Sequence, residues 1–484
     1  MADENQHTRG LSGSGQGVPI PLPKSPTYIR GLDEVLEGGL PAGQTTVISG
    51  GPGSGKTILG LEFLYRGALA GEPGIFVGFE ESSETIRRNA LTMGWDLGAL
   101  EQQNKLFLLV SPVRPDTLLS GEFTLKGLLA SVSGKVHEMG AKRIAIDALE
   151  VILRLFDTAQ HVRSEVHTLN DWLKNAGLTA LMTIRPRPGN RPSLYEEFFD
   201  SMADCVIQLD ARVSDQISTR RLRVIKYRGS GFGRNEYPYV ITESGLHTAP
   251  ITKVELRHRA LGEKISTGLE SLDTLLEGGI RRGACVLFAG LPGTGKTILV
   301  STFANAACLR GETVLYQGFE ESEDAMVTNL LSAGLDLEPH RRSGRMVFLT
   351  GMPESMGAEE HLIRFTRRLD AVSPDHVIVD AISACERMGG KQAAFEYLMR
   401  LLNICKERGI TSLLTNQTSG ASDVMEISGN GISSMVDTVL FLAYVEGSGE
   451  TYRMLQILKA RGSAHSNRHH RYIINDQGFQ LLEL

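Results

Sequence analysis

Short apolar segments alternate along the chain with longer segments in which apolar residues recur at spacings of three and four. Runs such as Gly74-Ile-Phe-Val-Gly78 are typical of buried strands, whereas Ser164–Ala176 and Phe395–Arg408 have the period of an amphipathic helix. This alternation predicts an α/β fold with a mainly parallel sheet covered by helices on both faces. The predicted strands are 45–49, 74–78, 106–110, 143–147 and 180–183 in the first half, and 284–289, 314–316, 346–349, 377–380 and 411–415 in the second.

The pattern occurs twice. Leu36-Glu-Gly-Gly-Leu40 is matched 240 positions later by Leu276-Glu-Gly-Gly-Ile280. Further along, the offset becomes 233, because Lys226-Tyr-Arg-Gly229 matches Lys459-Ala-Arg-Gly462. The second copy is therefore shortened by seven residues between these points, and the chain is predicted to be a tandem duplication of one α/β unit.

Composition places boundaries around the two copies. Residues 1–25 contain a Gly- and Ser-rich run and then prolines, so they are predicted to form a flexible N-terminal tail. A proline and several charges mark 249–262 as a linker. The predicted domains are 26–248 and 263–484, each long enough to bury its own core.

Charge and cysteine content argue against several classes of protein. The formal net charge of −6 over 484 residues gives no electrostatic footprint for sequence-independent binding to nucleic acid or to a membrane. The five cysteines show no C-x-x-C spacing, which predicts neither disulfides nor a zinc site and fits a reducing cytoplasm. No apolar run approaches the roughly 18 residues that span a bilayer, and the N-terminus lacks a signal-peptide core.

Two phosphate-binding loops are the strongest chemical signal. Gly50-Gly-Pro-Gly-Ser-Gly-Lys-Thr57 and Gly290-Leu-Pro-Gly-Thr-Gly-Lys-Thr297 both fit G-x-x-x-x-G-K-[ST], in which backbone N–H groups and the Lys surround phosphates. One match could arise by chance, but two in register could not. Each follows a predicted strand and precedes a predicted helix, 58–70 or 298–310, so the phosphates would lie at a helix N-terminus. The predicted nucleotide-binding residues are Gly51, Pro52, Gly53, Ser54, Gly55, Lys56, Thr57, Leu291, Pro292, Gly293, Thr294, Gly295, Lys296 and Thr297.

A carboxylate ends one buried strand in each copy. In phosphate-loop proteins Mg²⁺ is held by the loop Ser/Thr hydroxyl and by such a carboxylate. Asp147 and Asp380 end apolar runs, which would place them at the carboxyl edge of the sheet where ligands bind. An isolated Asp would be read as a helix N-cap, but the phosphate loop in the same copy favours the metal role. The predicted magnesium ligands are Thr57, Asp147, Thr297 and Asp380.

Paired glutamates follow a short strand in each copy at the same offset as the loops. Hydrolysis requires a group that orients or deprotonates the attacking oxygen. Two adjacent like charges are costly unless a cation or proton relieves them. A solvated loop would also tolerate such a pair, but its repetition favours catalysis. The predicted catalytic residues are Glu80, Glu81, Glu320 and Glu321.

Two cations precede a glycine late in each copy. Basic residues on a strand usually mark a solvated face. Ring ATPases, however, supply such cations to the γ-phosphate bound by the next subunit, where an arginine is worth about 10³ to 10⁵ in rate. The residues predicted to act from an adjacent subunit are Lys226, Arg228, Lys459 and Arg461.

Together these motifs resemble the KaiC family of circadian clock proteins, over essentially everything from about Tyr28 to the C-terminus. The resemblance implies two tandem RecA-like P-loop NTPase domains with mainly parallel sheets flanked by helices. It further implies a double-ring hexamer that binds Mg-ATP at up to twelve sites between subunits. ATP would be hydrolysed in the first ring and used in the second for serine autophosphorylation and dephosphorylation.

The resemblance also assigns single residues. Glu80 and Glu320 match the family's principal catalytic glutamates. Thr92 and Ser332 match positions that line the nucleotide. The family's phosphorylated pair corresponds to Ser433 and Ser434 here, in Gly431-Ile-Ser-Ser-Met-Val-Asp-Thr438.

This sequence departs from the family's clock members in two ways. Clock members continue past the second domain with a tail that binds a stimulating partner of the KaiA type, whereas this sequence ends at Leu484. A KaiA-type regulator is therefore not predicted from this sequence, whereas the resemblance leaves a KaiB-like regulator of the first ring open. The acceptor pair is Ser-Ser where clock members usually have Ser-Thr, so an ordered phosphorylation cycle does not follow from the sequence.

Two other functions stay open. A nucleic-acid-dependent RecA-family motor or recombinase is favoured by the fold and by Arg185, Arg187 and Arg191, which cluster where recombinases bind DNA. A nucleotide-switched scaffold would use slow turnover only to control a partner. Stimulation by single-stranded DNA would select the motor, and phosphate on the protein itself would select the kinase.

Overall fold

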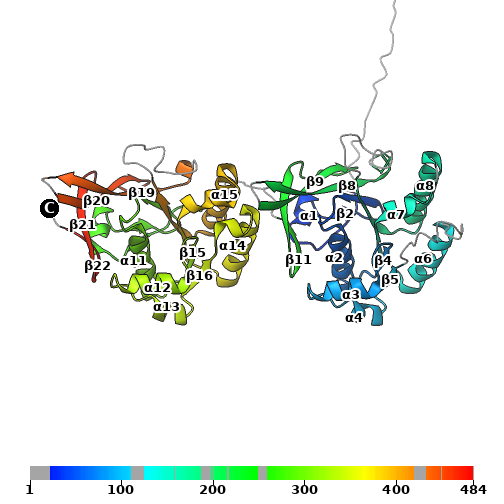
Figure 1. Ribbon diagram of the computed structural model, residues 1–484, viewed down its shortest axis with the longest axis horizontal. Coiled ribbons are helices and arrows are strands. Elements are labelled where there is room, and N and C mark those ends of the chain that lie inside the picture. Colours follow the sequence, from blue (N-terminus) through cyan, green and yellow to red (C-terminus); the bar gives the residue numbers. More distant parts are fainter. Residues whose placement is uncertain are drawn as a thin grey trace, which may run out of the picture. The chain divides into compact units, whose positions relative to one another are not determined.

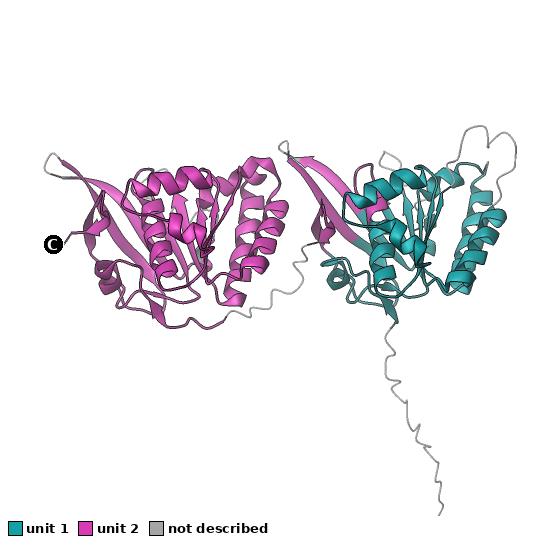
Figure 2. Ribbon diagram, turned by 90° about the horizontal axis from the view of Figure 1, so that it is seen from below, with its two compact units in different colours: residues 1–49, 59–208, 224–234 teal, residues 50–58, 209–223, 235–484 magenta. Residues whose placement is uncertain are grey.

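The computed structural model describes residues 22–110, 125–156, 158–186, 198–199, 201–214, 217–248, 259–418, 432–447 and 450–482 (Figure 1). The chain divides into two compact units, coloured in Figure 2. One comprises residues 1–49, 59–208 and 224–234, and the other comprises 50–58, 209–223 and 235–484. This division reflects local compactness, so the domain boundaries at 248 and 263 stay a prediction.

Each repeat contains one nine-stranded sheet, and the two sheets have the same strand order. In the first repeat the order is β5-β4-β6-β7-β3-β8-β9-β10-β11, and in the second it is β16-β15-β17-β18-β14-β19-β20-β21-β22. The strands on one side of β3 and β14 pair in parallel. In the second repeat β14 also pairs in parallel with β19, and the pairs from β19 to β22 are antiparallel. The predicted mainly parallel α/β class is confirmed.

The first repeat contains strands β1 (Lys24–Ser25), β2 (Leu40–Pro41), β3 (Thr45–Gly50), β4 (Gly74–Gly78), β5 (Leu106–Val110), β6 (Arg143–Asp147), β7 (Thr179–Ile184), β8 (Cys205–Ser214), β9 (Ile217–Tyr227), β10 (Glu236–Thr242) and β11 (Gly245–Thr248). Its helices are α1 (Leu32–Val35), α2 (Lys56–Leu69), α3 (Ser83–Leu91), α4 (Leu97–Gln102), α6 (Leu125–Met139), α7 (Leu149–Leu153) and α8 (Ala159–Asn175). All five strands predicted for this half are present.

The second repeat contains β12 (Lys264–Ile265), β13 (Ile280–Arg281), β14 (Cys285–Gly290), β15 (Val314–Gly318), β16 (Met346–Thr350), β17 (His376–Asp380), β18 (Thr411–Gln417), β19 (Thr438–Gly447), β20 (Glu450–Ala460), β21 (His469–Asn475) and β22 (Gly478–Leu481). Its helices are α10 (Glu270–Leu275), α11 (Lys296–Leu309), α12 (Glu323–Leu331), α13 (Glu338–Arg342), α14 (Ala358–Val372) and α15 (Lys391–Arg408), with 3₁₀ turns η1 (Pro353–Ser355), η2 (Ile382–Met388) and η3 (Ile432–Ser434). The five predicted strands of this half are also present.

Strand β17 shows why the parallel strands have continuous apolar sequences. Successive side chains of a strand point to opposite faces of the sheet. Val377 and Val379 belong to the core cluster that includes residues of α14 and α15, whereas Ile378 belongs to the cluster that includes residues of α11. Because both faces are covered, every position between the ends of β17 is apolar.

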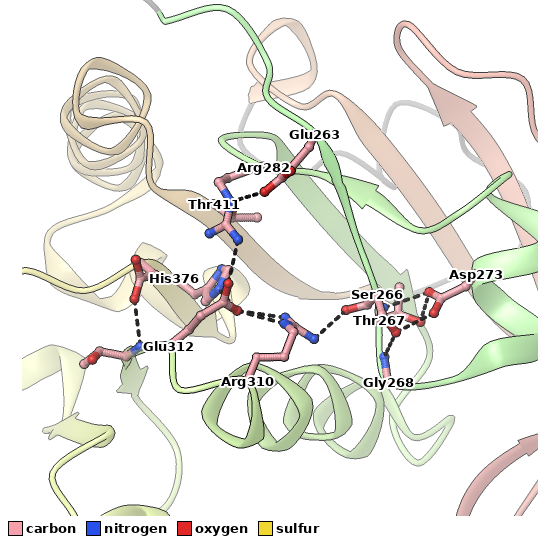
Figure 3. Close-up of polar contacts among 12 residues, drawn as sticks. Glu263, Ser266, Thr267, Gly268, Asp273, Arg282, Arg310, Glu312, His376 and Thr411 are labelled. Carbon is pink, nitrogen blue, oxygen red and sulfur yellow. Dashed lines mark hydrogen bonds and ion pairs between the residues drawn. The ribbon is translucent and has the colours of Figure 1, made fainter.

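A polar network around the buried His376 lies at the beginning of β17, at the opposite end of the strand from Asp380 (Figure 3). Nε2 of the fully buried His376 is 2.9 Å from Oε2 of Glu312. Glu312 also accepts from Arg282 at 2.5 Å and from Nη2 of Arg310 at 2.9 Å. Burial opposes ionisation of Glu312, but the hydrogen bonds from Arg282 and His376 outweigh it and lower the pKa of Glu312 to about 2. Burial lowers the pKa of His376, so the imidazole is held neutral.

The first repeat has a permanent cation at the same position. Arg143, which begins β6, is fully buried and forms an ion pair with Glu72. Its guanidinium also donates to the main-chain oxygens of Phe63 at 3.0 Å and Pro26 at 2.8 Å. The acidic partner is therefore common to both repeats, but only the second repeat places a titratable base, His376, beside it.

Candidate nucleotide-binding site

The second phosphate loop joins the end of β14 to the first residue of α11, as the sequence predicted. Nζ of Lys296 donates to the main-chain oxygens of Gly290 and Leu291, both at 2.9 Å. Burial lowers the pKa of Lys296, while the negative charges of Asp380 and Glu320 oppose this effect. The hydroxyl of buried Thr294 donates to Leu291 over 2.8 Å and braces the turn from within.

The first phosphate loop has the same internal contacts. Nζ of Lys56 donates to Gly50 at 2.7 Å and to Gly51 at 3.0 Å, and the Ser54 hydroxyl donates to Gly51 at 2.8 Å. Pro52 and Gly53 are exposed at the tip of this loop, as Pro292 and Gly293 are in the second. Backbone N–H groups at a helix start, together with a lysine, form a site for the phosphates of a nucleotide.

Asp380 is surrounded by hydroxyl groups. It ends β17 and accepts from Thr297 at 2.9 Å, from Tyr316 at 2.6 Å and from Thr415. Burial and the nearby Asp380 charge raise the pKa of Tyr316 well above its usual range, so this phenol stays protonated and donates. Hydroxyl and carboxylate oxygens are ligands that Mg²⁺ prefers, and the Thr297–Asp380 pair therefore fits the predicted metal site.

The strand-ending carboxylate of the first repeat, Asp147, also accepts from a threonine hydroxyl. Thr183 donates to Asp147 at 2.6 Å and accepts from the N–H of Ala148 at 2.9 Å. Phe76 stands on β4 where Tyr316 stands on β15, so this position supplies no phenol to Asp147. The two repeats therefore differ in how the predicted metal ligand is held.

The glutamate pairs directly follow β4 and β15, beyond a buried phenylalanine in each copy. Glu80, Glu81, Glu320 and Glu321 are all exposed. The charge of Glu320 acts on Lys296, which places this carboxylate near the phosphate loop. Glu321 instead accepts from Nδ2 of Asn329 on α12 at 3.1 Å. The catalytic roles of the two glutamates stay a prediction.

Thr92 and Ser332 end the helices that follow the glutamate pairs. Each hydroxyl is exposed and donates at 2.7 Å to the main-chain oxygen three residues earlier, that of Asn89 or Asn329. Their role in lining a nucleotide stays a prediction.

Lys459 and Arg461, which were predicted to act from an adjacent subunit, contact the segment of their own chain that contains the predicted phosphate acceptors. Nζ of Lys459 donates to the main-chain oxygen of Val436 at 2.6 Å. Arg461 donates to that of Ser434 at 3.0 Å and lies 3.8 Å from the carboxylate of Asp437. Asp437 is buried, accepts from the N–H of Cys285 and forms an ion pair with Lys406. The acceptor segment and the two cations are therefore in direct contact with one another.

In the first repeat the corresponding arginine makes equivalent contacts, whereas the corresponding lysine contacts a different main-chain oxygen. Lys226 donates to the main-chain oxygen of Ser201 at 3.2 Å, and Arg228 donates to the same oxygen at 2.5 Å. Arg228 also lies 3.6 Å from Asp204. Because the contacts of the arginine recur in both repeats, we infer that they belong to the structure that the two repeats share.

Some residues named in the sequence comparison lie outside the part of the chain that the structure describes. Arg187, Arg191 and Asp200 fall in undescribed segments, and the side chain of Ser433 is not described. Sequence reasoning also missed Tyr316 and Thr415, which bind Asp380 from neighbouring strands. The only sequence signal for Tyr316 was its alignment with Phe76, a difference of one hydroxyl group.

Two nine-stranded sheets, each with a phosphate loop after its central strand, define tandem RecA-like P-loop NTPase domains. A family model described as "ATPase: KaiC" matches the chain twice, over residues 25–253 and 265–484. The chain belongs to the KaiC family of ATPases.

Curated relatives match over nearly the whole chain. "Circadian clock protein KaiC2" of Synechocystis sp. is 38% identical over 471 residues, which cover 96% of this chain and 82% of that protein. "Circadian clock oscillator protein KaiC" of Parathermosynechococcus lividus is 35% identical, with coverage of 95% and 85%. The protein of the same name from Picosynechococcus sp. is 34% identical, with coverage of 98% and 92%. In the part of the chain that the structure describes, no helix has the length and apolar character to cross a membrane.

Proposed function

We propose that the chain is a Mg-ATP-dependent ATPase and serine autokinase/autophosphatase that assembles as a double-ring hexamer. The phosphate loops bind ATP, and Thr57, Asp147, Thr297 and Asp380 are the magnesium ligands. Bound Mg²⁺ supplies charge neutralisation on the phosphates. The protein's output is a signalling switch of the clock or stress type, and the names of its relatives, which refer to the circadian clock, support the clock type.

The contact between Arg461 and the main-chain oxygen of Ser434 carries the kinase proposal. Lys459 and Arg461 contact the segment that contains the acceptor serines. If these cations reach the γ-phosphate held by a neighbouring subunit, that segment also lies close to the phosphate. Ser434 is exposed at this edge. A phosphate bound by these cations would therefore lie close to a serine hydroxyl.

Transfer then follows from the roles of the residues. The hydroxyl oxygen of Ser434, or of Ser433, forms a bond to the γ-phosphorus while the bond from that phosphorus to the ADP oxygen breaks. Glu320 accepts the hydroxyl proton. In the first repeat a water molecule takes the place of the serine, Glu80 orients it, and inorganic phosphate is released.

Exposed apolar side chains support self-association. Three apolar positions are exposed at corresponding places in both repeats, although isolated exposed apolar residues are ordinary. Their repetition supports the proposal that each repeat presents a surface to a second copy of the chain. The pairs, with their exposed fractions, are Leu69 (61%) and Leu309 (72%), Leu91 (57%) and Leu331 (57%), and Ile225 (41%) and Leu458 (37%).

The other functions receive less support. The family match does not favour a nucleic-acid motor. A KaiB-like regulator on the first ring remains a proposal from the family alone. A nucleotide-switched scaffold would share the fold and the ATP sites, and differs from the kinase in leaving no phosphate on the protein.

Phosphopeptide mass spectrometry of the purified full chain after incubation with Mg-ATP tests the proposal. We expect phosphate on Ser433 and Ser434, and a loss of most of it in Arg461→Ala. Arg468→Ala, which removes an exposed arginine nearby, is the matched control and should keep it. Hydrolysis without phosphate on either serine would reject the kinase, and turnover that requires single-stranded DNA would identify a motor.

A further inference from the structure

Each phosphate loop is held from behind by a buried tyrosine on the antiparallel side of its sheet. The Tyr472 hydroxyl on β21 donates to the main-chain oxygen of Thr294 at 2.6 Å. In the first repeat, the Tyr239 hydroxyl on β10 donates to that of Ser54 at 2.6 Å. Both tyrosines are 1% exposed. The same contact therefore occurs twice, at the residue before the invariant Gly-Lys of each loop.

The geometry of the peptide bond connects this contact to the nucleotide site. In a trans peptide the C=O and N–H groups point in opposite directions. A hydrogen bond that fixes the oxygen of Thr294 therefore also fixes the N–H of Gly295, on the opposite side of the same peptide plane. In phosphate loops such N–H groups bind the phosphates. A hydrogen bond to the oxygen also polarises the peptide and strengthens the N–H as a donor.

The second repeat holds a further peptide plane. The Tyr444 hydroxyl on β19 donates to the main-chain oxygen of Gly293 at 2.7 Å. Tyr444 pairs with Arg453 on β20, which pairs with Tyr472 on β21. Residues directly opposite one another in antiparallel strands lie on the same face. Tyr444 and Tyr472 thus form one row that faces the loop and holds two consecutive peptides.

The first repeat lacks the second hydroxyl. Ala211 occupies the position that corresponds to Tyr444, and Nε of Arg220 contacts the oxygen of Gly53 at 3.4 Å instead. An N–H···O distance of 3.4 Å is longer than an ordinary hydrogen bond. A tyrosine hydroxyl therefore holds one peptide of the first loop, whereas tyrosine hydroxyls hold two peptides of the second loop.

Close packing limits movement of the loop toward the strands. Gly295 has a φ of 93°, and a Cβ atom there would collide with Ile474 of β21. Gly55 has a φ of 85° and would meet Ile241 of β10 in the same way. The aromatic ring of Tyr472 is itself fixed by stacking on Phe479, with ring centroids 4.4 Å apart. The tyrosines are thus anchored in the sheet, and the loop is anchored to them.

We propose that Tyr239, Tyr444 and Tyr472 are positioning residues that orient phosphate-binding peptides of the two loops from the antiparallel half of each sheet. This inference rests on the proposed binding of ATP by the loops. The phosphate loop would then depend on strands that lie far along the chain, rather than act as a self-contained motif. Changes in these strands would alter nucleotide affinity without touching the nucleotide.

The test compares Tyr→Phe variants of the full chain, which lose only a hydroxyl group. A Lys56→Ala background restricts nucleotide binding to the second loop. In that background, equilibrium titration with fluorescent methylanthraniloyl-ADP should show about fivefold weaker binding for Tyr472→Phe and a smaller loss for Tyr444→Phe. Hydrogen exchange of residues 290–297 should become faster in both variants.

Tyr397→Phe is the matched control. Tyr397 is also 1% exposed, and its hydroxyl donates to Gln317 at 2.9 Å, away from the loop. This variant should keep the parental affinity and loop exchange even if its thermal stability falls. Tyr444 is 38% exposed, so Tyr444→Phe remains testable if Tyr472→Phe does not fold.

The outcomes distinguish failure of the proposed nucleotide site from failure of the proposed positioning role. If the Lys56→Ala parent binds no ADP analogue, the proposed nucleotide site is wrong. If the parent binds and the tyrosine variants match it in both affinity and loop exchange, the positioning role is wrong. Equal weakening in Tyr397→Phe would also overturn the inference, because it would show a general effect of stability.

Discussion

The phenol of Tyr316 on β15 donates a hydrogen bond of 2.6 Å to Oδ2 of Asp380 at the end of the neighbouring strand β17. The same oxygen accepts from Thr297, the threonine of the phosphate loop. The first repeat has Phe76 in place of the tyrosine, so the two repeats hold their predicted metal ligands differently. Groups that orient a metal ligand contribute to metal affinity, and their loss typically costs 10- to 100-fold.

Tyr316→Phe should therefore weaken binding of the divalent ion at the second site by about tenfold. Titration of the ATP-loaded protein with Mn²⁺, followed by electron paramagnetic resonance of the free ion, measures this directly. Phe76→Tyr is the reciprocal variant and should leave the second site unchanged. An unaltered Mn²⁺ affinity in Tyr316→Phe would show that the phenol only fills space.

The two repeats should divide the chemistry between them, because only the second has serines at both positions of the acceptor pair. Replacement of Glu80 and Glu81 by Gln should remove most steady-state ATP hydrolysis and spare phosphate incorporation. The same change at Glu320 and Glu321 should have the opposite effect. Phosphate release and phosphopeptides are measured on the same samples, and equal loss of both activities from either pair would contradict the assignment.

A negative charge at position 433 should act as a switch. Ser433-Ser-Met-Val-Asp437 aligns with Asp200-Ser-Met-Ala-Asp204, so the first repeat has a carboxylate where the second has a modifiable serine. A carboxylate partly imitates the charge of about −1.5 to −2 on a phosphoserine. Ser433→Asp should shift the second repeat's hydrolysis toward that of the first, and adding Ser434→Ala should block further phosphate uptake.

The comparison variant for this switch is Ser433→Ala, which removes the acceptor without adding charge. ATPase rates and phosphopeptide maps are compared among all three variants. If the Asp and Ala replacements behave alike in every assay, the charge at position 433 is not the switch.

Acid should destabilise the second repeat before the first. Burial lowers the pKa of His376 below 6.5, and at the same time Nδ1 has no hydrogen-bond partner in the described part of the chain. As the pH falls below about 6.5, His376 is therefore protonated more readily in the unfolded chain than in the folded protein. The stabilisation is fully present above about pH 6.5 and is lost as the pH falls below it.

The charged groups around His376 influence its protonation in opposite directions. Arg282 opposes protonation, whereas Glu312 and Asp375 favour it. The pKa of Glu312 is itself lowered to about 2, so its contribution to stability is lost only as pH falls from about 4.5 toward 2. The corresponding Arg143 in the first repeat does not titrate in this range.

The two tryptophans, Trp95 and Trp172, both lie in the first repeat, which makes the acid prediction measurable. Far-UV circular dichroism reports both repeats, whereas tryptophan fluorescence reports the first. The dichroism transition should begin at a higher pH than the fluorescence transition, and His376→Gln should bring the two closer together. Coincident transitions in the parent protein would contradict the prediction.

The sequence predicted the parallel half of each sheet well because its physical signals are local. A strand such as 106–110 is a continuous apolar run, and duplication allowed each assignment to be checked against its copy. The antiparallel pairing of β19 to β22 was not predicted, because alternating polar sequences do not specify which strand pairs with which. Tyr472 and Thr294 are 178 positions apart, so no sequence spacing could indicate their hydrogen bond.

The candidate site was predicted in the same uneven way. Phosphate loops and strand-ending carboxylates are recognisable because they combine a fixed spacing with a strand boundary. The sequence predicts Lys459 and Arg461 on a strand, but their contacts with Val436 and Ser434 depend on how β20 lies beside the acceptor segment. Tertiary packing alone determines that relationship.

The central claim is that a serine of one subunit receives phosphate from ATP bound by another, and mixed protomers test it most directly. One chain carries Lys296→Ala, which disables the second phosphate loop and leaves both serines intact. The other carries Ser433→Ala and Ser434→Ala, which removes the acceptors and leaves the loop intact. The chains are mixed before Mg-ATP is added, and the phosphopeptides are measured by mass spectrometry. The account predicts phosphate on the serines of the Lys296→Ala chain in the mixture and none in either chain alone. Phosphate on the Lys296→Ala chain by itself, or none in mixed assemblies shown by light scattering to have formed, would contradict it.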